Sequence, residues 1–61
     1  MTITIITTEG TVTLSADRWT RDEGNDVYVY DDDNGEDPVA TIDSKQFVAA
    51  YRTGALLTER D

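Results

Sequence analysis

The densest group of side chains that could do chemistry lies in the stretch DDDNGED, residues 31–37. Its five carboxylates belong to Asp31, Asp32, Asp33, Glu36 and Asp37. Ca²⁺ prefers such ligands, but an EF-hand loop needs acids at positions one and three, glycine at position six and a bidentate glutamate at position twelve. With Gly35 at position six, Tyr30 stands at position one and Thr41 at position twelve. The spacing therefore predicts no metal site, and we interpret the stretch as a charged surface.

Catalytic chemistry has few candidates elsewhere in the chain. There is no histidine and no cysteine, so the usual general base and the thiolate nucleophile are both absent. Ser15 and Ser44 therefore lack a base that would activate them. A carboxyl group serves as acid or base when a pocket shifts its pKa, and a domain of 61 residues has little volume to enclose one. The sequence predicts a protein that is not an enzyme, with no catalytic residues and no cofactor.

The overall charge narrows the range of partners. Thirteen acidic residues against five basic ones give a net charge of −8. Binding to nucleic acid requires clustered Lys and Arg that neutralise phosphates, and anionic membranes are disfavoured for the same reason. No apolar run approaches the roughly 20 residues that span a bilayer. The start, MTITIITTEG, lacks the basic residues and the apolar core of a signal peptide. We therefore expect a soluble, cytoplasmic protein that contacts neither nucleic acid nor membrane directly.

Aromatic residues join the acidic ones in the predicted partner-binding set. Trp, Tyr and Arg are enriched in binding hot spots, and Trp19 stands close to Arg18 and Arg21 in a polar segment. Trp19 either anchors an interface or covers an open end of the core, with the arginines pairing nearby acids. Tyr28 and Tyr30 alternate with valines, so they occupy the strand face opposite those valines. The predicted partner-binding residues are Asp31, Asp32, Asp33, Glu36, Asp37, Trp19, Tyr28 and Tyr30.

The first element expected to support this surface is a β-hairpin over residues 2–15. The segments TITIITT and TVTLS alternate with a period of two and are rich in β-branched residues, which is typical of strands. A two-residue turn at Glu9-Gly10 would pair Ile5 with Leu14. That register places Val12 and Leu14 on the same face as the isoleucines, so this face is expected to form part of the core.

A second hairpin is predicted over residues 27–43. VYVYD and PVATID flank Asn34-Gly35, and both of these residues tolerate the positive φ of a type I′ turn. The turn sets like charges opposite one another, so the tip should splay into solvent. The predicted register pairs Tyr30 with Val39, Val29 with Ala40, Tyr28 with Thr41 and Val27 with Ile42.

A helix is predicted over residues 44–53. Asp43 or Ser44 can cap its first turn, and Gly54 can end it in the left-handed conformation. The apolar stripe of this helix would consist of Phe47, Val48, Ala50 and Tyr51.

The predicted fold class is α+β: a single small domain with a four-stranded antiparallel sheet of two β-hairpins, followed by one α-helix. A half-open barrel is the alternative arrangement. The boundaries are hairpin 2–15, connection 16–26, hairpin 27–43, helix 44–53 and tail 54–61. Which sheet face the helix covers stays open. The predicted core consists of Ile3, Ile5, Val12, Leu14, Val27, Val29, Ile42, Phe47 and Tyr51.

Two functions agree with this sequence. The first is a small acidic protein-binding module that regulates or inhibits a partner protein with a basic surface. In size and charge alone the chain is similar to small acidic inhibitors of nucleic-acid enzymes, often phage-encoded, whose carboxylates occupy a groove meant for phosphates. The second is a homo-oligomeric accessory protein of a salt-adapted organism, whose acidity serves solubility only. Because so small a core is marginal and exposed edge strands invite pairing, we also expect a homodimer.

Overall fold

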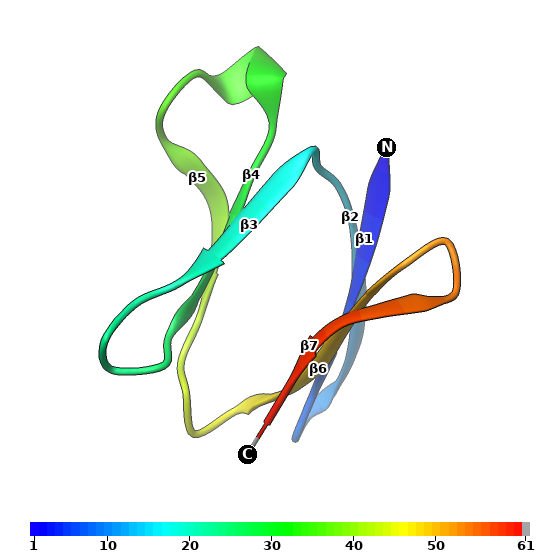
Figure 1. Ribbon diagram of the computed structural model, residues 1–61, viewed down its shortest axis with the longest axis vertical. Helices are drawn as coiled ribbons and strands as arrows, with labels where there is room; N and C mark the ends of the chain where they lie inside the picture. Colours follow the sequence, from blue (N-terminus) through cyan, green and yellow to red (C-terminus); the bar gives the residue numbers. More distant parts are fainter. Residues whose placement is uncertain (61) are drawn as a thin grey trace.

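The computed structural model describes residues 1–60, which form almost only β-strands (Figure 1). Two antiparallel sheets have the strand orders β2-β1-β6-β7 and β3-β4-β5. The predicted α+β class is therefore wrong, because the only helix in the described chain is one 3-10 turn. The predicted single four-stranded sheet of two hairpins is also wrong, because the two hairpins belong to different sheets. No helix in this range is long and apolar enough to cross a bilayer. The elements are β1 (Thr2–Thr7), β2 (Gly10–Ser15), β3 (Arg18–Arg21), β4 (Val27–Tyr30), η1 (Asp32–Asn34), β5 (Pro38–Ile42), β6 (Phe47–Arg52) and β7 (Ala55–Glu59).

The predicted helix 44–53 is replaced by one turn and strand β6. The turn lies at the residues that were predicted to cap the helix. Asp43 Oδ1 accepts the N–H of Lys45 at 2.9 Å, and the Asp43 carbonyl accepts the N–H groups of Gln46 and Phe47. The chain then extends, because β6 lies between β1 and β7 and pairs with both. A short apolar run fits a buried strand and a buried helix equally well by periodicity. Only the pairing with β1 and β7 decides between them.

The glycine that was expected to end the helix instead closes a hairpin. Thr53 and Gly54 both have positive φ, 52° and 79°, which is the pattern of a type I′ turn. This turn joins β6 to β7, so most of the predicted tail 54–61 is a paired strand. Leu57 from that strand packs against the core.

The first hairpin is confirmed as a hairpin, but its register differs from the prediction. Ile5 pairs with Val12, and Ile3 pairs with Leu14. The turn therefore lies one residue earlier than Glu9-Gly10. Relative to the prediction, each residue of the first strand pairs with a residue two positions earlier in the second strand. Because side chains alternate between faces with a period of two, this shift leaves every side chain on its predicted face.

The second hairpin keeps the predicted register over most of its length. Val27 pairs with Ile42, Tyr28 with Thr41 and Val29 with Ala40, and a bulge then shifts Tyr30 onto Pro38. The tip is not a type I′ turn at Asn34-Gly35. Instead η1 precedes Gly35, which has φ of 65° and ψ of −131°.

The predicted connection 16–26 contains strand β3, which completes the second sheet. Trp19 pairs with Val29, and Arg18 pairs with Tyr30. The chain changes sheets at a corner: the N–H of Ala16 still donates to the carbonyl of Met1, just before β1, and that of Asp17 donates to the carbonyl of Tyr30 in the second sheet. The two sheets are thus joined by consecutive residues, and they face each other in Figure 1.

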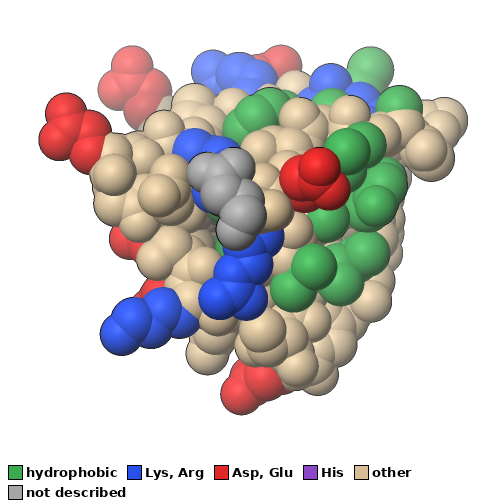
Figure 2. Space-filling model, turned by 60° about the horizontal axis from the view of Figure 1, so that its bottom comes forward, with side chains coloured by type: hydrophobic (Ala, Val, Ile, Leu, Met, Phe, Trp, Pro, Cys, Tyr) green, Lys and Arg blue, Asp and Glu red, His purple; other side chains and the backbone are tan. Residues whose placement is uncertain are grey.

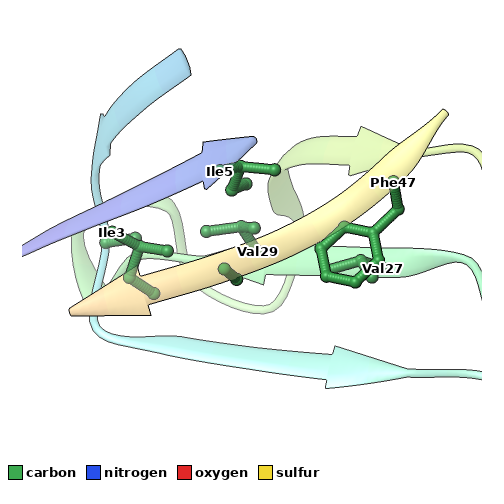
Figure 3. Packing of buried hydrophobic residues seen from close by; sticks show 7 residues of the cluster. Ile3, Ile5, Val27, Val29 and Phe47 are labelled. Carbon is green, nitrogen blue, oxygen red and sulfur yellow. The ribbon is translucent and has the colours of Figure 1, made fainter. Parts of the chain in front are cut away.

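The core lies between the two sheets. In Figure 3 side chains from β1 and β6 meet those from β4: Ile3, Ile5, Phe47, Val27 and Val29. These five predicted core residues are buried, and Leu14 and Ile42 pack against them while partly buried. Two predicted core residues differ: Val12 on the edge strand β2 is 46% exposed, and Tyr51 is half-buried. The small residues Ala16 and Ala50, which the prediction omitted, complete the core.

Candidate protein-binding surface

The acidic loop, residues 31–37, connects β4 to β5 and projects beyond one end of the sheet β3-β4-β5 (Figure 1). Asp31 is half-buried where the loop leaves β4. The other four carboxylates of the loop are exposed: Asp32, Asp33, Glu36 and Asp37. The structure therefore brings all five predicted acidic residues together on one solvent-facing loop.

Hydrogen bonds within the loop hold its backbone in one shape. The N–H of Asn34 donates to the carbonyl of Asp31 at 2.9 Å, and the N–H of Gly35 donates to that of Asp32 at 3.2 Å. The Asn34 side-chain Nδ2 closes the far side by donating to the carbonyl of Asp37 at 3.1 Å. The carboxylates are thus displayed from a turn with fixed geometry.

Asp17, at the corner between the sheets, ties the loop to the body of the protein. Its Oδ2 accepts the backbone N–H of Asp32 at 3.0 Å. This bond, followed by hydrogen bonding with the Asp31 side chain, lowers the pKa of Asp17. The same side-chain bond with Asp17 is the main cause that raises the pKa of Asp31. As the pH falls, Asp31 is therefore expected to take up a proton before Asp17 does.

Arg18 fixes the loop from the other side. Its Nη2 donates to the carbonyl of Gly35 at 3.2 Å, while its guanidinium lies over the ring of Tyr30, 5.4 Å from the centroid. Together with Thr20 and Glu36, these two side chains line a pocket of about 270 Å³. The pocket joins the acidic loop to the outer face of the sheet β3-β4-β5.

The two tyrosines extend this surface along β4. Tyr28 and Tyr30 alternate with the buried Val27 and Val29, so both rings lie on the outer face. The hydroxyl of Tyr28 donates to Asp22 Oδ2 at 2.9 Å. That bond raises the pKa of Tyr28 and lowers the pKa of Asp22. The outer face of this sheet therefore carries aromatic rings with fixed orientations next to the acidic loop.

Trp19 is the one predicted site residue that lies apart from the others. It pairs with the buried Val29 and packs against the core while half-buried, so it faces the opposite side of the sheet from the tyrosines. The prediction missed Asp17, Arg18 and Thr20, because residues 16–26 were interpreted as a connection. The alternation in RWTR was the available signal: a strand there places Arg18 and Thr20 on the outer face.

The chemistry of this surface consists of charge, hydrogen bonding and aromatic contact. Among residues 1–60, no three acidic side chains come together as a metal ion would require. No protein-family model matches the chain, and the comparisons with curated proteins and with solved structures found no match.

Proposed function

We propose that the protein is a non-enzymatic docking module whose acidic loop binds the basic surface of a partner protein and so regulates or inhibits it. The observation that carries this proposal is the combination of exposed carboxylates with a loop backbone held from both sides. Asp17 accepts a hydrogen bond from the loop, and Arg18 donates one to it. This anchoring holds the carboxylates in a fixed arrangement that a complementary basic surface can match.

The anchoring matters because ordering a flexible segment on binding costs free energy. A loop that is already ordered avoids much of that cost. Charges that complement a partner also raise the association rate and discriminate against wrong partners. A groove that binds phosphates presents the required basic surface, so the partner class that we favour is a nucleic-acid-binding protein. The proposed compartment is the cytoplasm, as expected from the sequence.

An arginine-rich peptide serves as a basic probe for this proposal. We expect the triple variant Asp32→Asn, Asp33→Asn, Asp37→Asn to bind the probe more weakly than the wild type. Its affinity should also fall less steeply with salt, because fewer charges attract across the interface. Fluorescence anisotropy over a series of salt concentrations measures both quantities.

A matched triple variant separates the loop from the net charge. Glu9→Gln, Glu23→Gln and Glu59→Gln remove the same number of exposed carboxylates outside the loop. This control should bind the probe nearly as well as the wild type. If both triple variants lose affinity equally, the loop is not a binding site and only the net charge attracts the peptide.

A second candidate function, self-association, is favoured by the outer face of the sheet β2-β1-β6-β7. Copies of a chain with net charge −8 repel one another, so they meet most readily where carboxylates are few. Figure 2 shows hydrophobic side chains gathered on the right, the side on which these strands lie in Figure 1. One paired row on this face runs Thr13, Thr4, Tyr51, Leu56, and the next runs Thr11, Ile6, Ala49, Glu59.

The oligomeric state tests this second candidate. We expect a mass of twice 6.8 kDa in sedimentation experiments, and a monomer when Leu56, which is 48% exposed, is replaced in Leu56→Asp. Val39→Asp changes a similarly exposed residue of the other sheet and should leave the dimer intact. A wild-type monomer at high concentration would reject self-association.

If the acidity serves solubility only, the protein should also unfold as salt is removed, because its carboxylates then repel without screening.

A further inference from the structure

A second pocket, of about 260 Å³, lies at the end of the molecule opposite the acidic loop. Three of the five basic residues of the chain meet there. In Figure 2, where this end is turned forward, Lys and Arg side chains lie near one another on the surface. Within residues 1–60 the pocket is lined by Arg21, Asn25, Ser44, Lys45 and Arg60, and each of these side chains can donate a hydrogen bond. No carboxylate of that range lines it.

Arg21 supplies a positive charge that is fixed in position. Its Nη1 donates to Thr58 Oγ1 and to the carbonyl of Glu59, both at 3.2 Å. Its guanidinium also lies over the ring of the buried Phe47, 5.3 Å from the centroid. The Nε atom is buried and has no hydrogen-bond partner among the described residues. These contacts use one end of the guanidinium and leave donor capacity for a ligand.

Two of the acids that neighbour the lining residues, Asp26 and Asp43, are directed toward backbone groups. Asp26 Oδ1 accepts the N–H of Ser44 at 2.9 Å, and Asp43 Oδ1 accepts the N–H of Lys45 at 2.9 Å. The first bond holds the segment 43–46, which carries two of the lining side chains, against the end of the β3–β4 turn that carries Asn25. The second bond lies within that segment and fixes its turn. The two carboxylates thus shape the pocket without lining it.

We propose that this pocket binds a tetrahedral dianion of the phosphate class, either inorganic phosphate or the terminal phosphate of a small molecule. Arg21, Lys45 and Arg60 approach from three separate segments, so together they can neutralise two negative charges from different directions. Asn25 and Ser44 add neutral donors for the remaining oxygens. This site is independent of the docking surface formed by the acidic loop.

Inorganic phosphate is the probe, titrated into the full chain at constant ionic strength and followed by amide chemical shifts. We expect saturable shifts centred on Asn25, Ser44 and Lys45. Lys45→Gln and Arg60→Gln, both at exposed positions, should each weaken binding about tenfold, because each removes a charge-assisted hydrogen bond. None of these variants replaces Asp61, which lies outside the described residues.

Arg18→Gln is the matched control, because it removes the same charge from β3 at a position that does not line this pocket. It should leave the phosphate affinity within twofold or so of the wild type. Glycerol 3-phosphate in place of inorganic phosphate should shift the same amides if the pocket accepts a terminal phosphate. The proposal is overturned if shifts do not saturate, if Arg18→Gln weakens binding as much as Lys45→Gln, or if acetate binds as tightly as phosphate.

Discussion

Thr53 is the residue whose replacement tests the turn between β6 and β7 most directly. It has φ of 52°, and Gly54 follows with φ of 79°. Left-handed backbone costs an L-residue about 1–2 kcal/mol, and β-branched residues are least suited to it. Asn tolerates this conformation far better, which is why Asn-Gly is preferred in type I′ turns. We therefore expect Thr53→Asn to raise the free energy of unfolding by about 1 kcal/mol.

That change is large enough to measure in so small a domain. The entropy of unfolding scales with chain length, so about 1 kcal/mol raises the Tm of a 61-residue domain by roughly 8 °C. Thermal and urea denaturation followed by circular dichroism should both show the gain. Thr53→Val is the control, because it removes the hydroxyl but keeps the β-branch, and it should bring no gain.

The same pair of variants can refute the reasoning. Thr and Asn have similar propensities inside a helix, so a helix over residues 44–53 predicts almost no change for Thr53→Asn. Unchanged stability would therefore contradict the left-handed turn and the hairpin of β6 and β7. An equal gain in Thr53→Val would show that loss of the hydroxyl, and not the backbone conformation, is responsible.

Two further predictions concern the acidic loop and the tyrosine face. Gly35→Ala should lower the free energy of unfolding by about 1–3 kcal/mol, because φ of 65° with ψ of −131° is strained for any residue with a Cβ. Gly24→Ala is the control, because Gly24 lacks a positive φ and an added Cβ there would meet only Asp22 Oδ1, at 3.5 Å. A Cβ added at Gly35 meets nothing within 4 Å, so a loss of stability there comes from the backbone and not from a clash. Equal losses in Gly24→Ala and Gly35→Ala would contradict backbone strain. Asp22→Asn should bring the pKa of Tyr28 back toward 10, because it removes the carboxylate whose hydrogen bond and charge raise that pKa. Since the folded pKa of Tyr28 is raised, its bond to Asp22 stabilises the fold below pH 10, and this stabilisation is lost as the pH rises through the raised pKa. An NMR titration of Tyr28 that is unchanged in Asp22→Asn would reject the role of Asp22 in raising the pKa.

The sequence alone determined those strands in which the alternation of apolar and polar residues fits no element other than a β-strand. In residues 2–5 and 27–30 every second residue is apolar and β-branched, so a strand is the element that buries Ile3, Ile5, Val27 and Val29 on one face. The exposure of the acidic loop was equally determined, because burying its unpaired carboxylates would cost far more than the fold can supply. These features depend on neighbours in the chain, and the structure agrees with them.

Tertiary pairing decided what local patterns left ambiguous. Residues 47–52 have an apolar run that suits a helix or a strand, and pairing with β1 on one side and β7 on the other made it β6. RWTR alternates as a strand does, but four mostly polar residues carry only a weak signal, and the pairing of Trp19 with Val29 made this segment β3. The basic pocket is the extreme case, because Arg21, Lys45 and Arg60 are far apart in the sequence. Such a cluster arises only from the packing of the two sheets, because sequence neighbours do not bring these side chains together.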